Sequence, residues 1–226
     1  MIAVVAQARL GSTRLPGKAL LPLGGKPLVY RVMEMLRAVK ADVYALACPA
    51  ECAAAFSQPA EQNGFRIVTG PEDDVLARYC NAVRELHADR VIRATCDNPF
   101  VFADAANALL EEGEEGFAAD YAAYASLPYG AGVESVAAEA LLRAEREAVL
   151  PTEREHVCPY LYGHGELFLL HRPLAPAKWR RPEIRLTVDT ADDYRYAQRL
   201  WDRLAEQGNG DFSGEAVIAA AESLLL

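Results

Sequence analysis

The first residues of the chain form a short apolar run, Ile2 to Ala6, in which polar and apolar side chains do not alternate. Such a strand is predicted to be buried on both faces, as in a parallel sheet covered by helices on each side. Three further strands are predicted from similar short runs: 43–47, 65–68 and 90–94. Between these runs, residues 27–39 and 73–86 carry apolar side chains at spacings of three and four, which is typical of helices. This alternation of strands and helices predicts an α/β fold with a mainly parallel sheet.

The second half of the chain is less regular. Three segments are predicted strands: 133–137, 167–171 and 183–188. The last of them alternates, with Ile184, Leu186 and Val188 on one face. Helices are predicted to begin with capping residues at three positions: Thr152 in the capping box Thr152–Glu155, Thr190, and Ser213. No repeat or long linker interrupts the chain, so we expect a single domain over residues 1–226.

The composition is that of a globular protein and restricts the partners that the chain can bind. Of the 226 residues, 52% are apolar and 24% are charged, and the net charge is −9. Nucleic acid is therefore not an expected partner, because binding it needs a dense basic surface. No apolar run approaches the roughly 20 residues of a membrane span, the start lacks a basic leader region, and the five cysteines are scattered. We expect a cytoplasmic protein with reduced thiols and no membrane insertion.

The loop after the first strand, residues 7–18, carries the strongest chemical signal. It follows the carboxyl end of a buried strand, where open α/β sheets place their ligands. Arg9, Arg14 and Lys18 put three cations within ten residues, and Gly11 allows close approach of the backbone to an anion. A polyphosphate is the expected ligand, although the spacing matches neither a Walker loop nor GxGxxG. The alternative is a solvated basic turn.

Longer motifs then identify a resemblance. The segment ARLGSTRLPGKALLPLGGKPLVYRV is similar to the opening of the cytidylyltransferases that activate acidic sugars, the acylneuraminate and 3-deoxy-manno-octulosonate enzymes. Further matches resemble the branch of the spore-coat polysaccharide biosynthesis protein F: residues 70–79, 153–160 and 185–193. The likeness runs in order from residue 3 to about residue 200. It implies a three-layer, Rossmann-like nucleotide-diphospho-sugar transferase fold, with a mainly parallel mixed sheet flanked by helices.

The resemblance also implies roles for individual residues. Nucleotide binding is expected from Ala8, Arg9, Gly11, Ser12, Arg14 and Lys18, with Arg9 and Lys18 also acting in catalysis. Asp97 and Asp189 match the acidic positions that bind Mg²⁺ in the family, and both follow predicted strands. We therefore expect the two carboxylates to converge on one Mg²⁺, which prefers hard oxygen ligands and often keeps phosphate oxygens in its shell. Without the family, Asp97 would be a turn residue and Asp189 a helix cap.

A third group matches regions of the family that contact the sugar. Glu134, Arg154 and His156 are the expected substrate-binding residues, with Arg154 as the cation for a sugar carboxylate. The alternative is structural, with Glu155 in a capping box and His156 inside the protein. The family further implies a homodimer, and the Pro-rich stretch 173–182 with Trp179 is the expected exposed arm, near residues 165–185.

Two departures from the family pattern affect the expected function. Cys96 stands where the family has Gly, next to the expected metal ligand, and Gly132 replaces an acidic residue. The expected reaction is CTP plus a sugar acid giving CMP-sugar and pyrophosphate, for surface or spore-coat polysaccharide synthesis. One alternative is a nucleotidyltransferase for another NTP and sugar. The other is a nucleotide-binding homologue that has lost turnover through Cys96.

Overall fold

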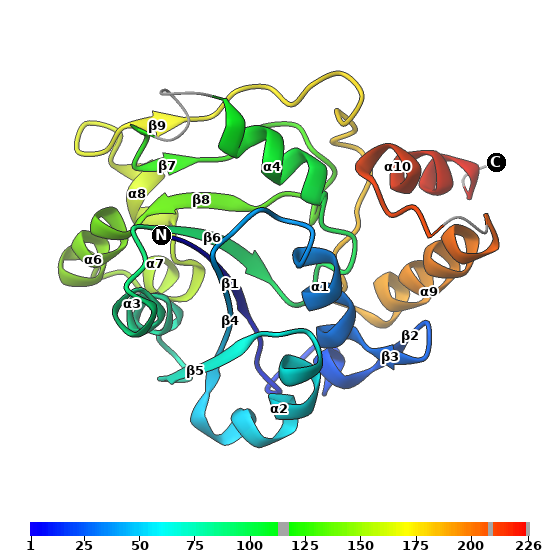
Figure 1. Cartoon of the computed structure of the whole chain (residues 1–226), viewed down its shortest axis with the longest axis horizontal. Coiled ribbons are helices and arrows are strands. Elements are labelled where there is room, and N and C mark those ends of the chain that lie inside the picture. The colour runs from blue at the N-terminus through cyan, green and yellow to red at the C-terminus, as the bar shows by residue number, and fades with distance from the viewer. Residues whose placement is uncertain (113–117, 208–209, 225–226) are drawn as a thin grey trace.

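A seven-stranded sheet lies at the centre of the computed structural model, which describes residues 1–112, 118–207 and 210–224 (Figure 1). Its order is β5-β4-β1-β6-β8-β7-β9. Four neighbouring strands are parallel: β5 (Arg66–Gly70), β4 (Val43–Pro49), β1 (Ile2–Gln7) and β6 (Arg90–Thr95). The strand β8 (Glu134–Ala137) is antiparallel to β6, and short strands β7 (Tyr121–Ala122) and β9 (Leu170–His171) complete the edge.

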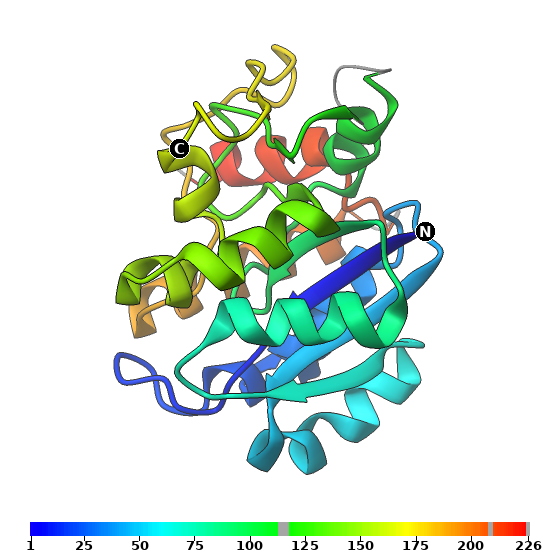
Figure 2. The same cartoon turned by 90° about the vertical axis from the view of Figure 1, so that its left-hand side faces the viewer.

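Helices cover both faces of this sheet. One face carries α1 (Leu28–Leu36), α2 (Ala53–Gln62) and α4 (Ala103–Glu111). The other face carries α3 (Val75–Leu86), α6 (Ala138–Glu147), α7 (Pro151–His156) and α8 (Pro159–Gly163). Figure 2 shows α3 and α6 side by side in front of the strands. Two further helices, α9 (Ala191–Glu206) and α10 (Gly214–Ser223), pack on each other beside α4.

The first strand shows why the sequence folds into layers. Ala3 and Val5 point into the cluster under α3 and α6, whereas Val4 and Ala6 point into the cluster under α1 and α2. All four are fully buried. Because successive side chains of a strand face opposite sides, an apolar run without alternation needs a helical layer on each face. The predicted three-layer α/β architecture is confirmed.

The second half of the sheet region departs from the predictions at residues 183–188. These residues form no strand, although Ile184, Leu186 and Val188 are buried as the alternation predicts. The backbone instead makes single connections, a bridge between Tyr129 and Arg185 and a hydrogen bond from the Val188 amide to the Asp97 carbonyl (2.8 Å). The alternation of apolar and polar residues therefore predicted correctly which side chains are buried. It did not predict a strand, because none of the described strands runs alongside this segment to pair with it.

The predicted helix caps have mixed outcomes. Thr190 and Ser213 cap α9 and α10, accepting from the amides of Asp193 and Ala216. The predicted capping box at Thr152 is wrong, because α7 begins one residue earlier at Pro151. Its N-terminal amide at Leu150 donates to the carboxylate of Glu153 (3.1 Å). The helix ends at His156, because the next residue, Val157, has a φ of 74° and interrupts the predicted continuous helix.

Trp179, which the sequence predicts to be the exposed anchor of the Pro-rich stretch, is buried instead. Trp179 is only 3% exposed and lies in the cluster of α4, α9 and α10, with its ring 6.3 Å from that of Tyr124. Arg181 is held against α10 by Glu222 (2.7 Å). Trp179 and Arg181 are therefore held against their own chain, because the indole gains more from an apolar cluster than from exposure to water, whereas Leu174 in the same stretch is 61% exposed.

Two simpler expectations concern the thiols and the membrane. All five cysteines are buried and unpaired, as predicted. Across residues 1–112, 118–207 and 210–224, none of the helices is both long and apolar enough to span a bilayer.

Candidate active site

A cavity of about 710 Å³ lies at the carboxyl ends of β1 and β6. Parallel strands place their carboxyl ends at one edge, so loops far apart in sequence meet there. Residues of the loop after β1, of the turn after β6, of segment 123–134 and of α7 all line this cavity. The cavity therefore joins most of the residues that the sequence singled out.

The loop after β1 contributes the expected cations to the cavity wall. Ala8, Arg9, Ser12, Arg14 and Lys18 all line it. The chain turns into a short 3₁₀ helix (Lys18–Leu20) through Gly17, whose φ of 66° is one that a glycine adopts without strain. This turn directs Lys18 back toward the end of the sheet. Gly11 lies beside the wall rather than in it, and a Cβ there would come within 3.1 Å of Glu72 Oε1.

Lys18 lies between the two predicted metal-binding carboxylates. Its Nζ is 2.9 Å from Asp97 Oδ2 and 3.1 Å from Asp189 Oδ1, and it also donates to the Val188 carbonyl at 2.9 Å. Those two carboxylate oxygens can therefore be at most about 6 Å apart, since both contact one nitrogen. The structure thus brings together two residues that lie 92 positions apart in sequence. We call Lys18, Asp97 and Asp189 the lysine cluster.

Further cations hold the Asp189 carboxylate from its outer side. Arg14 lies 3.1 Å from Oδ1, and Arg185 donates to Oδ2 at 2.8 Å. Burial alone would raise the pKa of Asp189, but the hydrogen bonds and charges of Lys18, Arg185 and Arg14 hold that pKa below its ordinary value. Asp189 is therefore ionised at neutral pH and fixed in orientation.

Asp193 supports this arrangement from the first turn of α9. Its carboxylate accepts from the amides of Asp189 (3.0 Å) and Thr190 (2.9 Å) and pairs with Arg185 at 3.0 Å. Burial would raise the pKa of Asp193, yet Arg185 and the two backbone amides lower it to about 2. These contacts make Asp193 a structural residue of the start of α9.

The lysine cluster has the donor chemistry that suits Mg²⁺. An ammonium stands among two carboxylate oxygens and one carbonyl oxygen, which are hard ligands of the type that Mg²⁺ takes. No group of three or more His, Cys, Asp or Glu side chains suited to a metal occurs in the part of the chain that the structure describes. Two carboxylates without a third side chain fit a magnesium ion that also binds substrate phosphates.

The opposite wall of the cavity holds a partly buried ion pair. Arg93 on β6 pairs with Glu134 on β8, and the Tyr121 hydroxyl donates to the same carboxylate at 2.8 Å. Glu134 and Arg93 line the cavity, so one of the predicted sugar-side residues is placed there. Each charge has its partner within the sheet, unlike the shared ammonium of the lysine cluster.

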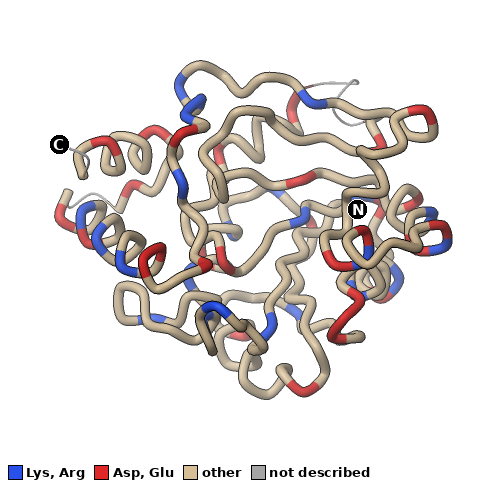
Figure 3. Tube along the Cα trace, turned by 180° about the vertical axis from the view of Figure 1, so that it is seen from behind, with Lys and Arg blue, Asp and Glu red and all other residues tan. Residues whose placement is uncertain are grey.

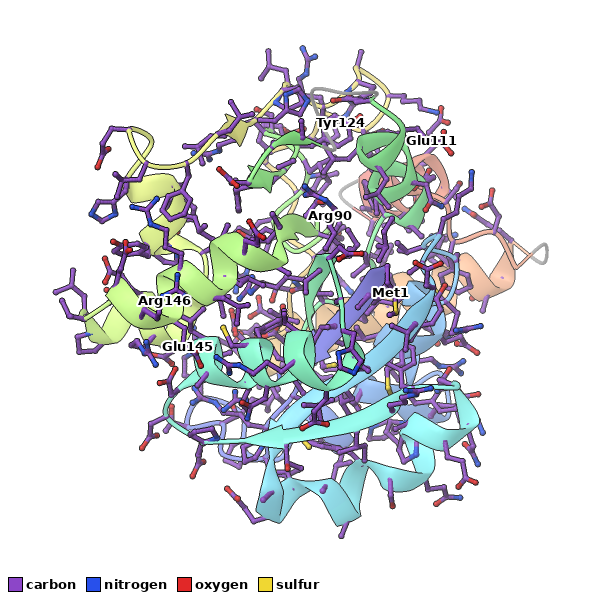
Figure 4. The ribbon with its side chains drawn as sticks, turned by 60° about the vertical axis from the view of Figure 1, so that its left-hand side comes forward. Met1, Arg90, Glu111, Tyr124, Glu145 and Arg146 are labelled. Atoms are coloured by element: carbon purple, nitrogen blue, oxygen red, sulfur yellow. The ribbon has the colours of Figure 1, made fainter. Side chains whose placement is uncertain are left out.

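The other two sugar-side predictions have different outcomes. His156 is exposed on the cavity wall rather than inside the protein. Glu155 next to it pairs with Arg9 across the cavity at 3.2 Å. Arg154 does not reach the cavity. Its guanidinium pairs with Asp74, Nε lying 3.0 Å from Oδ2, and donates to the carbonyl of Glu145, which lies on α6 in the outer helical layer (Figure 4).

Arg78 and Gln7 are cavity residues that sequence reasoning missed. Arg78 on α3 is 1% exposed, donates to the Pro71 and Glu72 carbonyls, and makes no ion pair among residues the structure describes. Burial lowers its pKa, and a buried, uncompensated guanidinium is costly unless it serves a ligand or a fold contact. Gln7 Oε1 is buried in the same wall without a donor. Sequence reasoning missed Arg78 because an arginine within a predicted helix is usually a surface residue.

Cys96 lines the cavity beside Asp97, but its thiol is almost fully covered. Its side chain is 5% exposed and packs in the cluster under α1 and α2. Burial and the neighbouring Asp97 carboxylate raise the pKa of the thiol well above its ordinary value. Cys96 is thus a neutral core residue beside Asp97.

The charges around the site balance one another. Figure 3 shows basic and acidic residues interleaved along the trace rather than separated into one region of each sign. The cations Arg9, Arg14, Lys18 and Arg93 each have a carboxylate within 4 Å. The three cations of the loop after β1 thus occur in a chain of net charge −9 and pair with its carboxylates.

Comparison with known proteins finds cytidylyltransferases among the relatives of this chain. The profile of the family described as cytidylyltransferase matches residues 3–218. The spore coat polysaccharide biosynthesis protein SpsF of Bacillus subtilis is 31% identical over 214 residues, 91% of this chain and 88% of the relative. The 3-deoxy-manno-octulosonate cytidylyltransferase of Anaeromyxobacter dehalogenans is 35% identical over 118 residues, 51% of this chain and 48% of the relative.

Solved structures share the architecture. A cytidylyltransferase from Leptospira borgpetersenii has a TM-score of 0.86 at 24% identity and covers 98% of this chain and 94% of its own. A CMP:2-keto-3-deoxy-manno-octonic acid synthetase complexed with CTP has a TM-score of 0.67 at 17% identity, covering 91% and 99%. Both confirm the predicted nucleotide-diphospho-sugar transferase fold.

Proposed function

Because this chain belongs to the cytidylyltransferase family, we propose that it transfers the cytidylyl group of CTP to a hydroxyl of an acidic sugar, releasing pyrophosphate. Family membership supports nucleotidyltransferase activity, and the nature of the sugar and metal is our proposal. The observation that carries it is the lysine cluster beside the cationic loop, both at the carboxyl edge of the sheet. An enzyme that handles a triphosphate needs this combination of anion and metal binding.

The residues of the cluster would divide the work. Asp97 and Asp189 would hold Mg²⁺, which would neutralise charge on the phosphates when bound. Arg9, Arg14 and Lys18 bind and orient the phosphate oxygens, and Arg185 keeps Asp189 in position. The attacking sugar oxygen bonds to the α-phosphorus as the bond to pyrophosphate breaks, and the hydroxyl proton leaves to water. Positioning and charge stabilisation suffice for this step, so a protein nucleophile is not required.

The sugar would occupy the wall formed by Arg93, Glu134, Glu155 and His156. Arg154 was expected to bind the sugar carboxylate, but its partners are Asp74 and the Glu145 carbonyl. His156 on this wall and Arg9, which pairs with Glu155 across the cavity, are the groups that could take that role. The relative named for spore coat polysaccharide biosynthesis supports a place in surface polysaccharide synthesis.

The test is a pyrophosphate-release assay with Mg²⁺, each of four NTPs and a panel of sugar acids and neutral sugars. We expect release with CTP and a sugar acid only. Release with another NTP would favour the alternative of a different base, and release with a neutral sugar would overturn the acidic acceptor. Absence of release with every pair, together with normal CTP binding, would favour a non-catalytic homologue, the alternative that Cys96 in place of the family Gly suggests.

The proposed partner also includes a second copy of the chain. Trp179 cannot anchor it, since that indole is buried. The segment between α8 and Trp179 instead exposes Leu167, Leu169 and Leu174, the last two more than half exposed, near the edge strand β9. Exposed apolar side chains of this size suit an interface. We expect a dimer mass by light scattering at micromolar concentration and a monomer for Leu169→Glu/Leu174→Glu; a monomeric wild type would contradict this.

A further inference from the structure

The ammonium of Lys18 uses all of its hydrogen-bonding capacity inside the protein. A lysine side chain has three N–H donors, and here they go to Asp97 Oδ2, Asp189 Oδ1 and the Val188 carbonyl. The side chain is 16% exposed. Lys18 therefore has no free donor for a phosphate in this state, although it lines the cavity.

The position that Lys18 fills is the one that a cation between the two carboxylates would need. A divalent ion within bonding distance of both carboxylates would come close to the ammonium, and like charges at such short range repel strongly in a partly buried site. Lys18 and a metal ion therefore cannot occupy the space between the two carboxylates at the same time.

We propose that Lys18 is an internal counter-ion that keeps the metal out until nucleotide arrives. Phosphate oxygens then draw Lys18 toward Arg9 and Arg14, and the carboxylates become free for the metal. Metal and nucleotide binding are in this way positively coupled, and the coupling acts equally in both directions. The inference rests on the proposed function for the identity of the nucleotide, but its first step concerns the free protein alone.

Arg14 provides a matched comparison within the same site. It is also a cation 3.1 Å from Asp189 Oδ1, but it contacts only that carboxylate and is 65% exposed. An exposed cation on one side of one carboxylate does not fill the space between the two, and solvent screens its charge. Removing Arg14 should therefore change metal binding far less than removing Lys18.

The experiment measures Mn²⁺ binding to the protein without nucleotide, by loss of the free Mn²⁺ signal in electron paramagnetic resonance. We expect Lys18→Met to bind Mn²⁺ at least about tenfold more tightly than wild type, and Arg14→Met to differ by less than about threefold. The double variant Lys18→Met/Asp97→Asn should lose the gain, which assigns it to this carboxylate pair.

A second measurement covers the case in which Lys18→Met folds poorly, because it leaves two neighbouring carboxylates without their counter-ion. Mn²⁺ should raise the thermal midpoint of this variant and leave that of the wild type unchanged. Equal Mn²⁺ affinity in wild type and Lys18→Met, an equal gain in Arg14→Met, or a gain that survives Asp97→Asn would each overturn the proposal. The proposed function fails separately, in the pyrophosphate assay, since no nucleotide is present here.

Discussion

The two charged groups of the cavity are built in opposite ways. In the lysine cluster one ammonium is shared by two carboxylates and a carbonyl, contributed by three segments remote in sequence. In the opposite wall, Arg93 and Glu134 pair one to one on adjacent strands, with their backbones in register. The first arrangement can exchange its cation without unfolding anything, whereas the second is fixed by the sheet that carries it.

This difference separates chemistry from scaffold. The proposed binding and release of metal and phosphates by the lysine cluster requires partners that are easily replaced. The wall formed by Arg93 and Glu134 requires partners that keep their positions. Removing only one member of such a pair lowers the free energy of unfolding of the protein. Substitutions in the cluster should therefore affect turnover, and substitutions in the pair should affect stability.

The largest effect should come from the carboxylates of the cluster. We expect Asp97→Asn and Asp189→Asn each to lower turnover by about 1,000-fold, because each removes charge that acts on the reacting phosphates. The double variant should be little worse than either single one, since both residues serve one ion. Pyrophosphate release checks this. If the loss of turnover in the double variant were the product of the two single losses, the two residues would not serve one ion.

The opposite wall should respond in stability. We expect Arg93→Met to lower the free energy of unfolding by about 3 kcal/mol, since it leaves the partly buried carboxylate of Glu134 without its guanidinium partner. The paired variant Arg93→Met/Glu134→Leu should recover much of that loss. Urea denaturation measures both. If Arg93→Met were as stable as wild type and Arg93→Met/Glu134→Leu were unstable, this ion pair would not be what stabilises the wall.

A smaller effect is expected for the cationic loop. Arg14→Ala should weaken CTP binding about tenfold, the loss of one charge-assisted contact, and Lys18→Ala should also weaken it, both without unfolding the protein. Isothermal titration with Mg²⁺ present gives the affinities. Wild-type affinity in both variants would exclude this loop as the phosphate site.

The smallest effect concerns the support of the cluster by Asp193. Its folded pKa of about 2 lies below the ordinary value of 3.8, so the carboxylate stabilises the fold above pH 4 and loses this contribution as the pH falls through 2. Asp193→Asn should cost about 1 kcal/mol at pH 7, as expected for a helix-start residue, and almost nothing near pH 2. Unfolding curves at both values would reveal it, and a pH-independent loss would contradict this origin.

Much of the first half of the fold could be read from the sequence. The predicted strands 2–6, 43–47, 65–68 and 90–94 agree with β1, β4, β5 and β6 to within two residues. Buried parallel strands are short apolar runs with clear helical segments between them, so local pattern and tertiary position agree. The positions of the loop after β1 and of Asp97 followed directly from strand ends.

The remaining features depend on contacts that no local pattern records. Arg154 follows Glu153 on a helix that begins at Pro151, and this start turns its guanidinium toward Asp74 on α3 rather than toward the cavity. Trp179 next to Arg180 looks like a surface anchor, but α9 and α10 arrive later in the chain and cover it. The sequence around Arg78 predicts an exposed charge on a helix, but in the structure its guanidinium donates to the carbonyls of residues 71 and 72.

The backbone bond between Val188 and Asp97 has a consequence for redesign. Since the amide of Val188 donates to the carbonyl of Asp97, the main chain itself holds positions 97 and 189 at a fixed spacing, whichever side chains stand there. The two positions form a platform whose geometry survives a change of ligand type. Replacing one or both aspartates by histidine would present imidazole nitrogen at the same edge, so metal preference could be shifted toward zinc or nickel by two substitutions while the fold is left alone.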